Sequence, residues 1–344
     1  MAKAKRIKGI NCKSVASAGI KLVLLTRFDE LCSFQAMALD WTDPEGVHSM
    51  RVASRRLRSA LRDFMPYIRK RPLAQMLKQL RSIADALGEV RDQDVAIEAL
   101  EEMVGHAPAA LASGLSYFIE TRKQLREQAR DELKSILEAS ELKQLESQFI
   151  AGVDGATATH AGSPAITFST MSREIILERL KEFEALSNGL LNPFEIETLH
   201  DMRIAAKRLR YALELFQQCW GRAISGYAKR IARIQGALGG LHDCDVWIES
   251  LGKHIINARK HKQQEQVAAL MWLLSHLVKL RTKHLRQAFA RWREWETHEA
   301  SEKLRAALSN SAKGAKYESQ GQARSEAQRV APGPQIKEGL SGTH

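Results

Sequence analysis

The sequence predicts an all-α protein made of two four-helix bundles. Ala, Leu, Arg, Lys and Glu are abundant and there are only 8 prolines in 344 residues. This composition favours helix, because unbranched side chains lose little rotamer freedom there. Large apolar residues recur at spacings of three and four, the period of an amphipathic helix. The chain also repeats itself after about 150 residues, so the unit formed by the first half is expected again in the second.

Each half is expected to contain four helices joined by short connections, an arrangement typical of a bundle. Asp43-Pro44 and Asn192-Pro193 mark two helix starts, because each puts a capping side chain before a proline that suits the first turn. The first bundle is assigned to residues 15–150, with helices near 15–39, 44–70, 72–104 and 109–138. The second is assigned to residues 170–298, with helices near 170–188, 195–219, 223–258 and 262–296.

The segments outside the bundles differ from them in composition. Residues 151–169 are rich in Gly, Ala, Thr and Ser and are interpreted as a linker. Residues 299–344 carry so few large apolar side chains that they are predicted to be largely disordered. Residues 1–14 are interpreted as a solvated basic arm, with an organellar targeting segment as the alternative. The four cysteines show neither zinc-site spacing nor the density of a disulfide scaffold, so a reducing cytoplasm is the expected location.

The net charge of +12 indicates a polyanionic partner, such as nucleic acid, an anionic membrane surface or another negatively charged polymer. Charge alone does not distinguish among these partners. Membrane insertion is not expected, because no apolar run approaches the roughly 18 residues that a spanning helix needs.

The strongest repeat carries two stripes when it is placed on a helical wheel. Residues 47–68 match residues 199–220 without a gap, with 10 identities in 22 positions at an offset of 152. One stripe, which includes Leu57 and Leu209, is apolar and is predicted to face the core. The second stripe lies about 100° further around the helix and is basic in both halves. It comprises His48, Arg51, Arg55, Arg58 and Arg62 in the first half, and His200, Arg203, Lys207 and Arg210 in the second.

Most charged rows on helices are solvated faces, and that is the alternative here. Solvated faces mix Glu with Lys, however, whereas these two rows keep one sign, mostly as Arg, at matching positions. Guanidinium groups offer forked donors that match phosphate oxygens, and the row from His48 to Arg62 spans roughly 21 Å of helix. The rows therefore indicate an extended phosphate polymer as ligand, with each histidine adding a donor when it is protonated.

Further basic residues are expected to extend this surface, with a merely solvated role as the alternative for several of them. They are Arg56 and Arg208 beside the rows, Lys21, Arg27, Arg173 and Arg179 on the first helices, Lys78, Arg81, Lys229 and Arg233 on the third, and Arg126 and Arg281 on the fourth.

A second repeat, residues 77–100 against 228–251, contains the motif Leu-Gly-x-x-x-Asp-x-Asp-Val in both copies. The acids Asp92, Asp94, Asp243 and Asp245 are interpreted as structural, either re-capping a helix interrupted after Leu-Gly or orienting nearby Arg groups. His242, Asp243 and Asp245 could instead hold a metal in a phosphohydrolase. The first copy has Arg91 in place of His242, and a guanidinium cannot bind a metal, so neither a metal nor any other cofactor is expected.

At these motifs the sequence resembles the CHAD family, the conserved histidine α-helical domain. The resemblance covers residues 15–296 and rests on His48-x-x-Arg51-x-x-x-Arg55-Arg56-Leu57-Arg58, on its copy from His200 to Arg210, and on the two Leu-Gly motifs. It implies two pseudo-symmetric bundles that enclose a basic central cavity, which binds inorganic polyphosphate, often at polyphosphate granules. The triphosphatase domain of the CYTH type that often accompanies such domains is not recognised, since Glu195-x-Glu197 is followed by Leu199 on a predicted helix.

We therefore expect a polyanion-binding module that is not an enzyme, located in the cytoplasm at polyphosphate granules. Its ligand is expected to be inorganic polyphosphate, with sulfate or phosphate as mimics. Nucleic acid is the alternative partner, disfavoured because few aromatic residues lie near the rows to stack on bases. The phosphohydrolase is the second alternative. The chain carries no GxxxxGK phosphate loop and no GxSxG nucleophile elbow. The sequence leaves the oligomeric state open.

Overall fold

The computed structural model describes residues 4–158 and 166–309, and this part of the chain is all-α, as predicted. The long helices of the first half are α1 (Ala16–Cys32), α3 (Glu45–Phe64), α4 (Ala74–Val104), α5 (Ala112–Ile136) and α6 (Ala139–Thr157). Those of the second half are α7 (Phe168–Ala185), α8 (Ile196–Trp220), α9 (Arg222–Lys260), α10 (Gln264–Thr297) and α11 (Ala300–Ser309). Short helical turns are α2 (Gln35–Ala38), η1 (Met65–Tyr67), η2 (Arg71–Leu73), η3 (Ala109–Leu111) and η4 (Ser187–Leu191).

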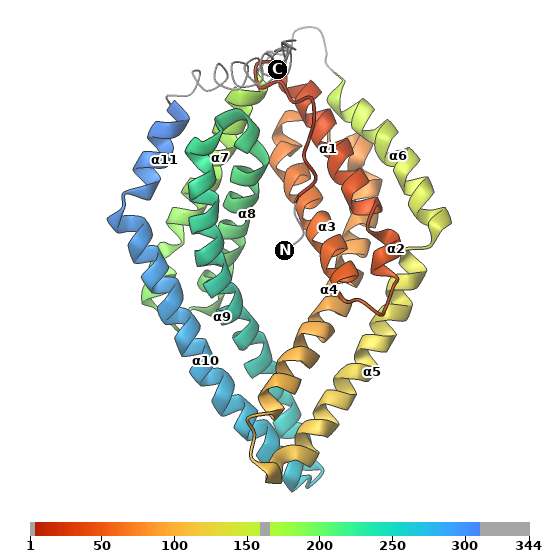
Figure 1. The fold of residues 1–344 in the computed structure, drawn as a ribbon, viewed down its shortest axis with the longest axis vertical. Helices are drawn as coiled ribbons and strands as arrows, with labels where there is room; N and C mark the ends of the chain where they lie inside the picture. The colour runs from red at the N-terminus through yellow and green to blue at the C-terminus, as the bar shows by residue number, and fades with distance from the viewer. Residues whose placement is uncertain (1–3, 159–165, 310–344) are drawn as a thin grey trace, which may run out of the picture.

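The two halves form the two sides of a diamond that meet at both ends (Figure 1). At one end α3 packs on α8 and α1 on α7, and at the other α5 packs on α10. Each half therefore contacts the other through equivalent helices at the first end. None of the described helices combines the length and apolar character that crossing a bilayer would require.

The predicted apolar stripe of α3 faces the core. Leu57 and Phe64 are completely buried, and so are Leu209 and Phe216 at the matching positions of α8. Phe64 and Phe216 meet edge to face with ring centroids 6.2 Å apart, and Phe168 at the start of α7 packs on both. The aromatic cluster thus joins the halves where their equivalent helices meet.

A separate apolar cluster closes the opposite end of the diamond. Leu100 of α4, Leu115 of α5, Leu251 of α9 and Leu273 of α10 are all fully buried within it.

Two predicted boundaries are wrong. The linker assigned to 151–169 begins inside α6, because Phe149, Val153 and Ala156 of that helix are buried and extend its apolar stripe to Thr157. The tail assigned to 299–344 begins with α11, where Leu304 and Leu308 are buried against the bundle. The prediction of disorder for 310–344 and the linker residues 159–165 lie outside the described part of the chain.

The N-terminal residues 4–14 are anchored to the helices, while the side chains of Arg6, Lys8 and Lys13 remain exposed. Ile7 is 2% exposed, and the backbone N–H of Lys5 donates to Glu30 of α1 at 3.0 Å. Cys12 forms a disulfide with Cys219 near the end of α8. The arm is therefore tied to both halves, and the sequence analysis had assigned these cysteines no role.

Candidate anion-binding groove

The basic row of α3 lines an open groove of about 610 Å³, which residues of α4 and Lys207 of the α8 row also line. Tyr211 of α8 is the aromatic side chain among its lining residues. The basic groups that line it are Arg51, Arg55, Arg58 and Arg62 of α3, Arg81 of α4 and Lys207 of α8. Three carboxylates of α4 also line it, namely Asp85, Glu89 and Asp92. Six cations against three anions leave an excess of three positive charges in a confined space.

Lys207 shows most directly how closely the rows approach. Burial, together with repulsion from Arg55, Arg203, Arg62 and Arg58, lowers the pKa of Lys207 from 10.5 to about 7. Three of these arginines lie on α3 and one lies on α8. The ammonium group therefore sits where the two rows converge, and the groove holds like charges together without enough acid to neutralise them.

The first arginine of each row is held by the first aspartate of the repeated motif. Arg51 Nη2 donates to Asp92 Oδ1 at 2.8 Å, and Arg203 lies close enough to Asp243 for the carboxylate to stabilise its charge. Burial lowers the pKa of Arg203, and burial raises that of Asp243. Asp92 thus orients the guanidinium of Arg51 at the groove, and Asp243 offsets the charge of Arg203.

The glycine of each Leu-Gly step lies beneath the same arginine. A Cβ atom on Gly88 would stand 3.9 Å from the guanidinium of Arg51, and one on Gly239 would stand 4.0 Å from that of Arg203. The absence of a side chain there gives the guanidinium room to lie against the helix. Because α4 and α9 continue through these steps without a break, the suggested re-capping by aspartate is wrong.

The second aspartate of each motif contacts the fourth helix of its half. Asp245 Oδ1 accepts from Arg281 Nε at 2.5 Å, and Arg281 also donates to the carbonyl of Pro193 at 2.8 Å. Asp94 lies 3.8 Å from Arg126. Arg126 and Arg281 are thus held in structural ion pairs, away from the residues that line the groove.

Three histidines stand at the ends of the rows. His200 and His242 lie with their Nδ1 atoms 3.0 Å apart, so one neutral ring donates to the other. Burial, together with Arg203 and His200, lowers the pKa of His242 from 6.5 to about 4. Burial also lowers the pKa of His48 and of His200. All three shifts favour the neutral ring in the unliganded protein.

The phosphohydrolase alternative finds little geometric support here. Asp245 is engaged by Arg281, and Arg203 lies beside Asp243. Within residues 4–158 and 166–309, no group of three or more His, Cys, Asp or Glu side chains is arranged to hold a metal ion.

Four predicted ligands instead form an internal network that recurs at the 152-residue offset. Glu30 of α1 binds Arg27 at 2.5 Å and Arg56 of α3 at 3.0 Å. In the second half Glu182 of α7 binds Arg179 and lies 3.7 Å from Arg208 of α8. These arginines clamp the first helix of each half to the second.

Two further ion-paired groups lie where the halves meet. Arg179 also binds the buried Asp63 of α3 across the interface at 3.1 Å. Arg210 is 7% exposed, pairs with Glu214 at 3.4 Å and lies over the ring of Tyr211. Arg210 therefore ends the row inside the protein.

The remaining predicted residues lie outside the groove lining. Lys21 pairs with Asp154 of α6 at 2.6 Å, and Arg173 and Lys229 are exposed. Arg233 lines a separate pocket between α9 and α10.

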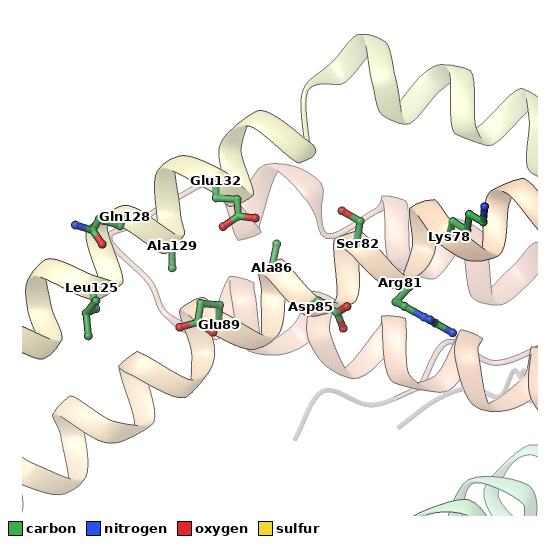
Figure 2. A pocket seen from close by; sticks show the side chains of 10 residues that line it. All are labelled: Lys78, Arg81, Ser82, Asp85, Ala86, Glu89, Leu125, Gln128, Ala129 and Glu132. Atoms are coloured by element: carbon green, nitrogen blue, oxygen red, sulfur yellow. The ribbon is translucent and has the colours of Figure 1, made fainter. Parts of the chain in front are cut away.

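Lys78 lines a neighbouring pocket of about 710 Å³ between α4 and α5, which Arg81 also borders (Figure 2). Figure 2 shows Glu132 of α5 and Glu89 of α4 among the side chains that line it. The mixture of charges makes this pocket a poor site for a polyanion.

Sequence reasoning missed Arg130, which acts on Asp94 alongside Arg126 and lies over the ring of Trp41. Its spacing of four residues from Arg126 on a predicted helix was the signal that could have revealed it.

Comparisons with known proteins agree with this architecture. The family model of the CHAD domain matches residues 23–252. The crystal structure of the CHAD domain from the plant Ricinus communis is similar with a TM-score of 0.61 and 22% sequence identity, covering 89% of this chain and 95% of that one. PptA from Streptomyces chartreusis is similar with a TM-score of 0.60 and 14% identity, covering 81% of this chain and 100% of that one. No curated protein matches the chain.

Proposed function

The chain belongs to the CHAD family, and from that premise we propose that it binds inorganic polyphosphate in the groove between α3 and α8 without acting on it chemically. The observation that carries the proposal is the convergence of the two basic rows on Lys207, whose ammonium is destabilised by burial and by four arginines. A phosphate chain laid between the rows would supply the missing negative charge. In this proposal the two halves are the products of an internal duplication and together enclose a basic central cavity.

The shape and donors of the groove favour an extended, uniform phosphate polymer. The α3 row presents a guanidinium every three or four residues, a rise of roughly 5 Å, and forked donors pair with the non-bridging oxygens of successive phosphates. Asp92 already orients the Arg51 side chain in the free protein, so less conformational entropy is lost when the ligand binds. We propose that Arg51, Arg55, Arg58, Arg62, Arg81, Arg203 and Lys207 contact the chain.

Polyphosphate is favoured over nucleic acid because the groove offers cations but little surface for bases. Tyr211 is the aromatic side chain among its lining residues, and Arg210 covers that ring. Single-stranded nucleic acids gain much of their affinity from stacking on aromatic side chains. Competition at equal phosphate concentration tests this preference, and displacement of polyphosphate by DNA or RNA would overturn it.

Titration with a labelled long-chain polyphosphate at several salt concentrations tests the binding itself. The variant Arg55→Gln/Arg58→Gln removes two cations of the lining and is expected to weaken binding at least tenfold and to lower the salt dependence of affinity. Lys229→Gln removes a cation exposed on α9 and serves as the matched control. Equal affinity in the double variant and the control would refute the assignment of the groove.

The absence of catalysis is part of the proposal and is tested separately. Incubation of the protein with polyphosphate and a divalent metal is expected to release no orthophosphate. Release that depends on Asp243 would establish the phosphohydrolase instead.

Location in the cytoplasm at polyphosphate granules is a further part of the proposal. A fluorescent fusion is expected to coincide with the granules in wild-type form and to disperse when Arg55 and Arg58 are replaced. A dispersed wild-type fusion would contradict the granule association.

A further inference from the structure

A second cationic pocket lies between α9 and α10, apart from the groove. It has a volume of about 190 Å³ and is lined by Arg230, Arg233, Arg291, Glu294, Trp295 and His298. We propose that it is an independent site for a single phosphate group, either free orthophosphate or the end of a polyphosphate chain.

The charges in this pocket are not balanced by the protein. Arg291 pairs with Glu294 at 2.6 Å, which accounts for the carboxylate among the lining residues. The guanidinium groups of Arg230 and Arg233 form no ion pair or hydrogen bond with any residue of the described chain. These two groups lie one turn apart on α9 and repel each other, so a bound anion would lower the energy of the site.

The remaining lining residues limit what the pocket can hold. Trp295 is 2% exposed and its indole N–H already donates to Ser301, so its ring forms an apolar floor without a free donor. His298 donates from Nδ1 to the carbonyl of Glu294, so Nε2 is the ring nitrogen that remains open to a ligand. The small volume suits one tetrahedral group rather than a length of chain.

The pocket and the groove are lined by different helices. Residues of α3, α4 and α8 line the groove, whereas residues of α9 and α10 and His298 line the pocket. The two sites share no lining residue, so a ligand in one would not occupy the other.

The first half has no equivalent of the two unpaired arginines. At the 151-residue offset the counterparts of Arg230 and Arg233 are Gln79 and Ser82, both neutral. The pocket is therefore a property of the second half alone and does not follow from the repeated rows. The comparison also suggests a test variant, because Gln79 and Ser82 show which residues the equivalent helix α4 carries at the positions of Arg230 and Arg233.

The test compares three variant proteins with the wild type by calorimetry of orthophosphate and tripolyphosphate binding. Arg230→Gln/Arg233→Ser, which installs the first-half residues, is expected to weaken orthophosphate binding at the pocket at least tenfold. Arg55→Gln/Arg58→Gln removes any phosphate bound in the groove and is expected to keep the binding that the first variant loses, which separates the pocket from the groove. Arg230→Lys/Arg233→Lys, which keeps the charge, is expected to retain most of the affinity and shows that loss in the first variant is not misfolding.

The outcomes decide the proposal. Saturable orthophosphate binding that survives the groove variant and is lost in Arg230→Gln/Arg233→Ser supports the site. Tighter binding of tripolyphosphate than of orthophosphate at that site identifies a chain end as its ligand, and equal binding identifies free phosphate. Unchanged orthophosphate affinity in Arg230→Gln/Arg233→Ser, or no saturable binding in any of the four proteins, overturns it, whether or not the groove binds polyphosphate.

Discussion

Polyphosphate affinity is expected to fall as the pH rises from 7 to 9, because Lys207 loses its proton in this range. The pKa of Lys207 in the free protein is about 7, so the amine is largely neutral at pH 8. A phosphate chain in the groove would favour the ammonium and return its pKa toward the ordinary value of 10.5. Binding at alkaline pH must therefore take up a proton, and affinity decreases with pH.

The magnitude follows from proton linkage. If the bound pKa returns to 10.5, the association constant falls about fifty-fold between pH 7 and pH 9, and at pH 8 about 0.9 proton is taken up per site. The internal phosphates of a long chain keep their charge throughout this interval. Burial lowers the pKa of the row histidines in the free protein, so the change in affinity reports mainly on the amine of Lys207.

The assay is a calorimetric titration with long-chain polyphosphate at pH 7, 8 and 9, in buffers of different ionisation enthalpy that report the protons taken up. Lys207→Arg keeps its charge at all these pH values and is expected to flatten the profile. Lys229→Arg makes the same change on an exposed part of α9 and is expected to keep the wild-type profile. The reasoning would be refuted if polyphosphate affinity fell steeply with pH in Lys207→Arg, or if it did not change with pH in the wild type.

Three other predictions concern stability. Cys12→Ser opens a disulfide that spans 207 residues to Cys219 and is expected to lower the unfolding free energy by about 4 kcal/mol in urea titrations, whereas an unchanged midpoint would contradict it. Gly46→Ala would place its Cβ 1.9 Å from the carbonyl oxygen of Met37 and should cost several kcal/mol. Gly226→Ala, with nothing within 4 Å, should be neutral or stabilise by up to about 1 kcal/mol. His242 has its pKa lowered from 6.5 to about 4, so the unfolded chain binds more protons between these pH values and thermal stability should fall as the pH drops through that window. A pH-independent melting temperature there would contradict this.

The helical fold and the rows of α3 and α8 could be predicted because both depend on the spacing of residues within a single helix. An apolar stripe at spacings of three and four fixes the buried face of a helix, and Leu57 and Leu209 are buried accordingly. The basic stripe beside it must then lie close to whatever packs on that face. The repeat strengthened the inference, because two diverged copies kept one sign of charge.

The partners of the other arginines could not be predicted, because they depend on which helices pack together. Arg27 and Arg56 are separated by 29 residues and meet through Glu30, a contact that follows from the packing of α1 on α3. Helix α6 was missed for a different reason. Its Gly and Ala residues resemble a linker in composition, but Phe149, Val153 and Ala156 form a buried apolar stripe. Gly152 lets that face pack closely on Pro72 and Met76.

The groove departs from the pattern that the most buried charges of the molecule follow, and this contrast supports the proposed binding site. Elsewhere buried charges are paired, as in the contact of Arg179 with Asp63 and that of Arg281 with Asp245. Along the groove, Arg55 and Lys207 repel each other and no acid stands between them. Such repulsion lowers stability, and the aromatic cluster at one end and the leucine cluster at the other offset it by holding α3 and α8 in place. A fold selected for stability alone would mix acids into these rows, as it does in the neighbouring pocket between α4 and α5. The unpaired cations are therefore best explained by a ligand that brings the missing negative charge.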